Sequence, residues 1–412
     1  MTAFQLHTRP DGRAVPMLKL HWQRMLRIGK VASGAVLVLA CTHRSVAPLA
    51  PTAPVPVTVQ RAVLDSVRRV LDAAVTNGAF PGAYAVIGTR EGIIAEYGAG
   101  RLDSADAARP SAQTVWDMAS LTKVVGTTSA MLQLVASGAV DLNAPVTKYL
   151  PEWKVSGAER VTVRHVMTHS AGLPAWRALY KETDTPADAM RQVLATPLDT
   201  APGVRFVYSD LGFILMGALV ERVTGMTLAQ YDAQRVFGPA GMRDTRFLPP
   251  GSWRARIAPT EQDPWRQRKL RGEVHDENAA RLGGVSGHAG LFSTARDMAR
   301  FARLYLNHGT LDGVRVFDSA TVVAFTRVQD TTVSRRALGW ETPTGRNSAG
   351  TRLSAAAFGH TGFTGTSVWM DPERNLFVVL LTNRVNPTRQ NLIIGGVRTA
   401  LADAVVGALP RP

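Results

Sequence analysis

The chain of 412 residues contains a single cysteine, Cys41, so it cannot form an intrachain disulfide. It also lacks a long apolar run, because the strongest one, from Val31 to Ala40, is too short to cross a bilayer as a helix. The net charge is +15, but the basic residues are mostly scattered arginines, and no dense basic tract with interleaved aromatic residues occurs. We therefore expect no nucleic-acid partner, and a basic surface suited to an anionic envelope or an acidic substrate.

The N-terminal region has the layout of an export signal. The basic stretch 24–30 precedes the apolar run, which has the length of a signal-peptide core, and Cys41 follows directly. Val38 to Cys41 resembles a bacterial lipobox, although Leu39 stands where a small residue is usual. We predict a signal peptide over residues 1–41 with lipidation at Cys41, and hence an exported protein, periplasmic or anchored to the membrane. The alternative is a plain secretory signal with an incidental cysteine.

The rest of the chain reads as a tether followed by one large domain. Residues 42–59 are rich in Pro and Ala and predict an extended linker. Residues 60–412 are assigned to the domain, and the chain's composition, 45% hydrophobic and 19% charged, is that of a globular protein with a sizeable core.

Strand patterns lie near both ends of this domain, helical patterns fill its middle, and no β-α-β alternation occurs. This order predicts an α+β fold, in which one antiparallel sheet is built from both chain ends and an all-α lobe is inserted between them. A site is expected in the cleft between sheet and helices. The patterns predict helices over 60–77, 124–138, 161–169, 187–194, 211–223, 294–307 and 391–407, and strands over 83–88, 93–98, 366–370 and 376–382.

Ser120 and Lys123 stand three residues apart at the start of a helical pattern. On a helix such residues are neighbours on one face, and the helix N-terminus favours developing negative charge. An amine held against a hydroxyl can take its proton when the pKa of the amine is lowered. A Ser-x-x-Lys pair is common by chance, so its assignment as nucleophile and base depends on the rest of the chain.

Three further stretches contain candidate residues to act together with Ser120 and Lys123. Tyr208 precedes the helical pattern 211–223, and a nearby cation would lower the pKa of its hydroxyl and let it relay a proton. His360 opens a glycine-rich strand entry, where a backbone can approach a substrate closely. His288, next to glycines before the helix 294–307, is explained equally well by loop structure and by lining of the site.

With these motifs the chain resembles the serine β-lactamase and penicillin-binding-protein superfamily, in particular its class C and esterase-like branch. The resemblance lies in three motifs taken in order, Ser120-Leu121-Thr122-Lys123, Tyr208-Ser209-Asp210 and His360-Thr361-Gly362. The stretch from Val163 to Pro174 is also similar to that branch, and the resemblance extends over about residues 60–405. It implies a mixed sheet domain with an α-helical domain, in agreement with the layout above.

The resemblance also implies roles for individual residues. Ser120 corresponds to the acylated nucleophile, Lys123 to its base or proton relay, and Tyr208 to the tyrosine that acts as base or acid in acylation and deacylation. The implied chemistry needs no metal or cofactor.

The strand motif carries the implied substrate contacts. His360, Thr361 and Gly362 occupy the place of the family's Lys-Thr-Gly strand. The backbone N–H groups of Ser120 and Phe363 would then form the oxyanion hole.

Two departures from the family pattern bear on the substrate. Asp210 stands where Asn is usual, and a carboxylate cannot donate to a substrate carbonyl. His360 replaces Lys, so the fixed positive charge that helps to hold a substrate carboxylate is weakened or made pH-dependent. We therefore expect inefficient β-lactam hydrolysis, and cleavage of small esters or of amide and peptide bonds in peptidoglycan fragments. Arg384, after the last strand, is a candidate for binding a substrate carboxylate.

Other readings of the sequence are less economical. A catalytically weak penicillin-binding or sensor protein would usually have lost the Ser, Lys or Tyr. His165 and His169 are spaced for a metal, but no Glu follows His165, and packing is the favoured interpretation. A polar loop is favoured for His275, with substrate contact as the alternative. Ser170 narrowly misses a nucleophile-elbow motif, because the first Gly and a preceding strand are missing.

Overall fold

The computed structural model describes residues 52–103, 105, 107–345 and 347–410. The predicted signal peptide, Cys41 and most of the predicted linker lie outside these residues. The first helix, α1, begins at Val57 rather than at residue 60. Within the described part of the chain no single helix is long and apolar enough to cross a membrane. The helix α6 (Asp210–Thr224) and the helical stretch Leu228–Phe237 reach that length only as a pair bent by 73°.

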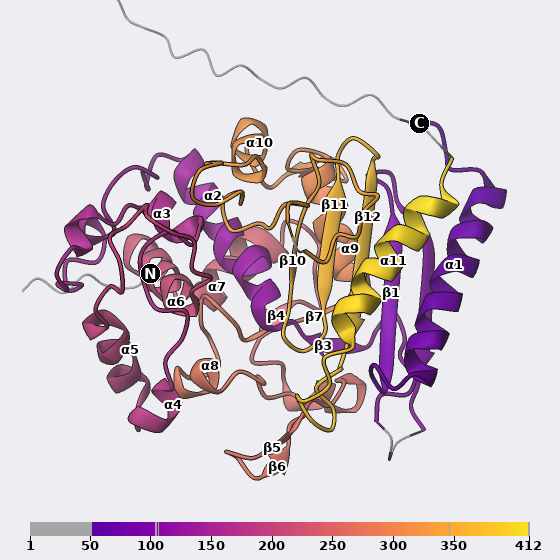
Figure 1. Ribbon diagram of the computed structural model, residues 1–412, viewed down its shortest axis with the longest axis horizontal. Coiled ribbons are helices and arrows are strands. Elements are labelled where there is room, and N and C mark those ends of the chain that lie inside the picture. Colours follow the sequence, from indigo (N-terminus) through magenta and orange to yellow (C-terminus); the bar gives the residue numbers. More distant parts are fainter. Residues whose placement is uncertain (1–51, 104, 106, 346, 411–412) are drawn as a thin grey trace, which may run out of the picture. The chain divides into compact units, whose positions relative to one another are not determined.

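A five-stranded antiparallel sheet forms the framework of the fold, and its strands come from both chain ends (Figure 1). Its order is β10-β11-β12-β1-β2, so that β1 pairs with its hairpin partner on one side and with β12 on the other. The predicted sheet built from both chain ends is confirmed. The five strands are β1 (Gly82–Gly88), β2 (Ile93–Gly100), β10 (Phe358–Thr361), β11 (Ser367–Asp371) and β12 (Leu376–Thr382).

Both faces of this sheet are covered, and every residue of its central strands β11, β12 and β1 is buried. Successive side chains of a strand point to opposite faces. In β1, Ala83 and Ala85 pack in a core with α1 (Val57–Thr76) and α11 (Ile394–Ala408), whereas Tyr84 and Val86 belong to the larger core that includes the helical lobe. The helix α9 (Ala295–Leu306) packs against β1, β11 and β12.

The predicted helical lobe occupies the middle of the chain. Its central helix, α6, begins at the capping residue Ser209, ends at Gly225 and buries most of its side chains. The helices of this region and of the segment that leads back to the sheet, α6 included, are α2 (Ser129–Ala136), α3 (Val163–Met167), α4 (Leu179–Glu182), α5 (Pro186–Ala195), α6 (Asp210–Thr224), α7 (Leu228–Asp232), α8 (Glu277–Arg281) and α10 (Ser319–Thr326).

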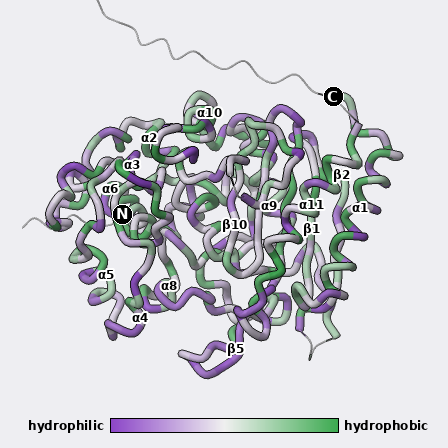
Figure 2. Tube along the Cα trace, viewed as in Figure 1, coloured by the Kyte–Doolittle hydropathy of each residue, from purple (hydrophilic) through white to green (hydrophobic). Residues whose placement is uncertain are grey.

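The short strands form small sheets of their own, one with the order β3-β7-β4 and two hairpins, β5-β6 and β8-β9. The hairpin of β5 and β6 is hydrophilic, as Figure 2 shows, whereas β3 and β7 are buried and lead directly to the candidate site. The short strands are β3 (Val115–Asp117), β4 (Arg246–Phe247), β5 (Gln262–Asp263), β6 (Arg268–Lys269), β7 (Leu291–Thr294), β8 (Thr310–Leu311) and β9 (Val314–Arg315).

Candidate active site

Ser120 lies in a tight turn that follows β3. Ala119 adopts a φ of 46°, which is uncommon for a residue with a side chain and costs about 1–3 kcal/mol. The buried Asp117 holds this turn, because its Oδ1 accepts the Ala119 N–H at 2.8 Å and its Oδ2 accepts the His275 N–H at 2.6 Å. Asp117 is therefore a positioning residue, and no motif in the sequence marks it.

The helix after Ser120 is less regular than predicted. A 3₁₀ turn, Ala119–Leu121, is followed by a π-helical segment, Lys123–Thr128, and only then by α2. π-Helical turns occur often at functional sites. Ser120 and Lys123 still share one face, with Nζ 2.9 Å from Oγ, and Lys123 is fully buried.

The Lys123 ammonium is bound on three sides. It donates to Ser120 Oγ at 2.9 Å and to the His288 carbonyl at 3.1 Å, and it forms an ion pair with Asp210 Oδ1 at 2.7 Å. Burial by itself lowers the pKa of Lys123, but the Asp210 carboxylate and Tyr208 raise it, and the net pKa is raised. A lowered pKa, the condition for Lys123 to take the proton as a free amine, is therefore not met in the resting site, because Asp210 supplies a counter-charge that Asn would not.

Tyr208 lies against Lys123, with its ring centroid 4.9 Å from Nζ. Burial raises the pKa of Tyr208, and the Lys123 cation and hydrogen bonds with Lys123 and Ser120 offset this only in part. The Lys123 cation does act to lower the pKa of Tyr208, but burial outweighs it and the net pKa is raised. The hydroxyl keeps its proton at neutral pH and is suited to donate it.

Ser209 explains why both of its neighbours reach the site. Its Oγ accepts the Gly212 N–H at 3.3 Å as the cap of α6 and donates to the Pro174 carbonyl at 2.6 Å. Its backbone is extended, and in such a backbone the flanking side chains point away from the central one. Tyr208 and Asp210 therefore both face Lys123.

His360 is buried on the edge strand β10 and carries no fixed charge. Its Nδ1 donates to the Thr361 carbonyl at 2.8 Å, while Nε2 has no hydrogen-bond partner among the described residues. Burial, and then the cations of Arg336 and Lys123, hold the pKa of His360 well below its usual range. The positive charge of the family's lysine is therefore missing here. Thr361 is half-buried at the end of the strand.

A tight turn after Thr361 carries the implied oxyanion donor. The Gly362 carbonyl accepts the Gly365 N–H at 3.0 Å, which places Phe363 second in the turn. A Cβ at Gly362 would lie 2.1 Å from Thr366 Oγ1, so a larger residue does not fit. Half of the Phe363 side chain is exposed.

Two threonine hydroxyls fasten this turn to the nucleophile segment. Thr364 Oγ1 donates to the Asp117 carbonyl at 2.7 Å, and Thr366 Oγ1 donates to the Met118 carbonyl at 3.1 Å. These bonds join residues far apart in sequence, and they set the position of Phe363 relative to Ser120.

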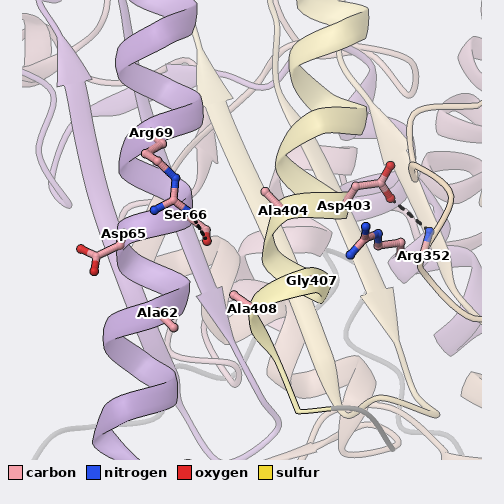
Figure 3. Close-up of a pocket in the computed structure, with 9 residues that line it drawn as sticks. All are labelled: Ala62, Asp65, Ser66, Arg69, Arg352, Asp403, Ala404, Gly407 and Ala408. Carbon is pink, nitrogen blue, oxygen red and sulfur yellow. Dashed lines mark hydrogen bonds between the residues drawn. The ribbon is translucent and has the colours of Figure 1, made fainter.

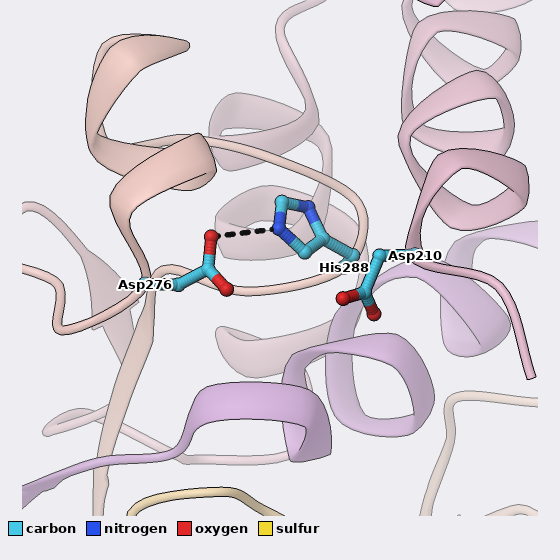
Figure 4. A group of neighbouring side chains, drawn as sticks. All are labelled: Asp210, Asp276 and His288. Atoms are coloured by element: carbon cyan, nitrogen blue, oxygen red, sulfur yellow. Dashed lines mark hydrogen bonds and ion pairs between the residues drawn. The ribbon is translucent and has the colours of Figure 1, made fainter. Parts of the chain in front are cut away.

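Asp210, Asp276 and His288 form a compact group beside Lys123 (Figure 4), with one potential ligand atom from each within 4.8 Å of the others. His288 Nε2 bonds to Asp276 Oδ1 at 2.9 Å, and Nδ1 to Ser286 Oγ at 2.8 Å. Lys123 is the counter-ion of Asp210, and His288 is hydrogen-bonded to Asp276. We therefore assign no metal to this group. The His288 carbonyl lines the site, and its ring belongs to the buried loop.

Arg384 is hydrogen-bonded to the turn that carries Phe363 and to the segment that follows β12. It donates to the carbonyls of Phe363 at 2.7 Å, Arg389 at 2.9 Å and Asn391 at 2.8 Å. Its guanidinium carbon also lies 4.3 Å from the Phe363 ring centroid. Backbone carbonyls occupy Nε and Nη1, so Arg384 holds the turn that carries Phe363, and its contact with a substrate carboxylate stays a prediction.

Arg336 is a site residue that the sequence analysis missed. It is buried beside a cavity of about 380 Å³, and its guanidinium carbon lies 5.8 Å from the ring centroids of both Phe206 and Tyr208. Glu341 is 3.4 Å away, and Nε has no hydrogen-bond partner among the described residues. An incompletely paired, buried guanidinium next to Tyr208 is suited to bind an anionic group.

Three other histidines singled out in the sequence have structural partners. His165 Nδ1 accepts the Thr162 N–H at the start of α3, and His169 Nδ1 accepts the Ser209 N–H. The His169 ring packs 4.5 Å from that of Tyr208, in keeping with the packing interpretation. His275 bonds to Glu261 at 2.9 Å and stacks on Phe363, and it lies buried in the predicted polar loop.

A groove of about 620 Å³ between α1 and α11 lies apart from this site (Figure 3). These helices cover the opposite face of the main sheet from the core that holds the nucleophile segment. Arg69 bonds to Ser66 there, and Asp403 accepts from the backbone of Arg352. We assign the groove no catalytic role.

Comparison with known proteins agrees with this geometry. The model of the Beta-lactamase family matches residues 67–398. Proteins named "Putative D-alanyl-D-alanine carboxypeptidase" from Salmonella schwarzengrund and Salmonella typhi are 33% and 32% identical, over 73% of this chain and 79% of theirs.

Solved structures with the same fold include a penicillin-binding protein homologue from Caulobacter crescentus, with a TM-score of 0.70, 21% identity and coverage of 87% of this chain and 99% of that one. The hydrolase EstCE1, described as having promiscuous acyltransferase activity, gives a TM-score of 0.69 at 21% identity, covering 84% and 99%. A family VIII carboxylesterase gives 0.66 at 23% identity, covering 88% and 100%. The chain belongs to the beta-lactamase family and is a serine hydrolase of that fold.

Proposed function

We propose that this protein forms an acyl-enzyme on Ser120 and acts as a carboxypeptidase on cell-wall peptides that end in a free carboxylate. The observation that carries the acyl-enzyme is the 2.9 Å contact between Lys123 Nζ and Ser120 Oγ, in hydrogen-bonding reach of Tyr208. The similarity to the Salmonella proteins supports the peptide class.

Acylation follows from the charges of the site. Ser120 Oγ forms a bond to the acyl carbon and passes its proton to Lys123, while Lys123 releases a proton to Asp210. Tyr208 donates its proton to the leaving amine as the amide bond breaks. The proton on Asp210 then returns through Lys123 to Tyr208, so the resting charges are restored. Water reverses the sequence in deacylation.

Arg336 supports the choice of an anionic substrate. His360 is neutral, so it cannot hold a substrate carboxylate by charge. The guanidinium carbon of Arg336 lies 5.8 Å from the Tyr208 ring centroid, beside a cavity. A carboxylate in that cavity would pair with the Arg336 guanidinium.

Cleavage of small esters is the second candidate. The exposed ring of Phe363, next to the implied oxyanion donor, offers an apolar surface to an acyl group. Two of the structural neighbours are an esterase-type hydrolase and a carboxylesterase.

Intact-mass spectrometry tests the acyl-enzyme and the substrate together. The panel is a D-Ala-D-Ala peptide, its C-terminal amide, a short nitrophenyl ester and a penicillin. We expect acyl adducts that disappear in Ser120→Ala and persist in Ser170→Ala, whose hydroxyl bonds only to its own segment. Preference for the free peptide over its amide supports the carboxypeptidase, and preference for the ester supports the second candidate. A wild type without any adduct contradicts both.

We also propose that the protein is exported and anchored through lipidated Cys41, so that it meets its substrate in the cell envelope. The support is the sequence pattern of residues 24–41. Metabolic labelling with palmitate in a bacterial host should give a labelled, membrane-bound protein, and Cys41→Ser should abolish the label. Release of the unmodified wild type into the soluble periplasmic fraction would point to the plain secretory signal.

A further inference from the structure

The turn that carries Phe363 is held by an arginine of the last helix. Arg398 of α11 donates from Nη2 to the Gly362 carbonyl at 2.7 Å and to the Thr366 carbonyl at 2.8 Å. Within the described residues no carboxylate lies within ion-pair distance of Arg398. Its charge is therefore directed at the backbone of the turn.

Peptide geometry links this contact to the oxyanion hole. The Gly362 carbonyl and the Phe363 N–H belong to one planar trans peptide, in which the two groups point in opposite directions. With the carbonyl fixed on Arg398, the N–H is turned to the other side of the peptide. A cation on the carbonyl also polarises the peptide and strengthens its N–H as a donor.

The neighbouring Arg384 does not hold the peptide that carries the Phe363 N–H. It donates to the Phe363 carbonyl, which shares a peptide with the N–H of Thr364. Burial and the nearby Arg384 lower the pKa of Arg398 to about 10, so its guanidinium stays charged at neutral pH. Only Arg398 of these two arginines holds the peptide whose N–H belongs to Phe363.

We propose that Arg398 is a positioning residue of the oxyanion hole, which fixes the Gly362–Phe363 peptide so that the Phe363 N–H faces the oxyanion at Ser120. This inference rests on the proposed acyl-enzyme function. Phe363 is the donor that touches the reacting oxygen, and Arg398 acts through it.

The test compares Arg398→Met and Arg398→Lys with the wild type by stopped-flow acylation with a nitrophenyl ester. Loss of a whole oxyanion donor lowers the rate about 10²–10³-fold, and a misdirected donor should cost about 10–100-fold. We expect this loss in the acylation rate constant of Arg398→Met, with substrate affinity changed less than about twofold. Arg398→Lys should recover part of the rate, because an ammonium can still donate to one carbonyl.

The second readout is the inhibition constant of phenylboronic acid, which forms a tetrahedral adduct with an active serine. It should weaken in Arg398→Met by the same factor as the acylation rate, which loosened packing alone would not produce. Arg352→Met removes a guanidinium that packs on the same helix in the groove of Figure 3, and both readouts should stay at wild-type values.

The proposed acyl-enzyme on Ser120 and the proposed role of Arg398 can be refuted independently. Absence of a wild-type acyl-enzyme overturns the proposed function. Wild-type acylation and boronic acid affinity in Arg398→Met overturn the role of Arg398. If Arg398→Met does not fold, Arg398→Lys decides, because unchanged acylation and boronic acid affinity together with a lowered melting temperature mean a structural role only.

Discussion

Lys123 Nζ lies 2.7 Å from Asp210 Oδ1 in the interior of the site, so the family's catalytic pair of Ser and Lys works here beside a carboxylate. The carboxylate outweighs burial and raises the pKa of Lys123. In the mechanism proposed above, Lys123 therefore carries protons between Ser120 and Asp210, and it is not a free amine in the resting site.

Replacing this carboxylate should change the pH profile of acylation. In Asp210→Asn burial remains and the counter-charge is gone, so the pKa of Lys123 falls. We expect acylation by the wild type to be nearly independent of pH between about 7 and 9, because Lys123 stays protonated below its ordinary pKa of about 10.4. The variant should show a rising limb in that window. Stopped-flow acylation measures both, and identical profiles would contradict the role of Asp210.

Removing the guanidinium of Arg336 should impair recognition of anionic substrates. A hydrogen bond to a charged group contributes about 1.5–3 kcal/mol, so Arg336→Met should raise KM for a peptide with a free carboxylate by about 10–100-fold. The same peptide with a C-terminal amide is the control and should change little. Glu341→Gln, which releases the ion pair at 3.4 Å, should lower KM for the free acid. Equal effects of Arg336→Met on acid and amide would show that the cavity does not bind the carboxylate.

The buried His360 should make the protein less stable in mild acid. Its pKa is well below the usual value in the folded state, so the unfolded chain binds a proton more readily. The stability it contributes is present above about pH 6.5 and falls by up to about 1.4 kcal/mol per pH unit below that. His360→Asn keeps a donor near the Nδ1 position and does not titrate. Urea unfolding at pH 7, 6 and 5 should show the wild type losing stability relative to this variant, and a constant difference would refute the assignment.

The threonine that ties the two catalytic segments together should matter for rate as well as stability. Thr364→Val keeps the shape but leaves the buried Asp117 carbonyl without this donor, which costs about 1–3 kcal/mol. The Phe363 turn is then free to shift relative to Ser120, so acylation should slow while substrate affinity is kept. The control is Thr399→Val, because the Thr399 hydroxyl lies on the exposed side of α11, and this variant should change the free energy of unfolding by less than about 0.5 kcal/mol. Unfolding free energies and acylation rates are measured for both variants. Wild-type acylation in a destabilised Thr364→Val would limit Thr364 to a structural role.

Much of the fold could be predicted because its elements have clear periodicity. The helix α1 and the hairpin of β1 and β2 follow from apolar spacing and a turn between two short apolar runs. The helix after Ser120 was only partly foreseen. Its 3₁₀ and π-helical turns depend on packing around Lys123 and on the Asp117 bonds, which leave no mark in a periodic pattern.

The sequence by itself determined the order of the elements and the identity of Ser120, Lys123 and Tyr208 as one constellation, since their spacing and the family resemblance are local properties of the chain. Only the tertiary structure decided the protonation of Lys123 and Tyr208, because burial and the carboxylate of Asp210 act through space. It also brought in Arg336 and Arg398, which are far from Ser120 in sequence and have no motif. Long-range contacts set charge and orientation in this site, and a linear pattern cannot encode them.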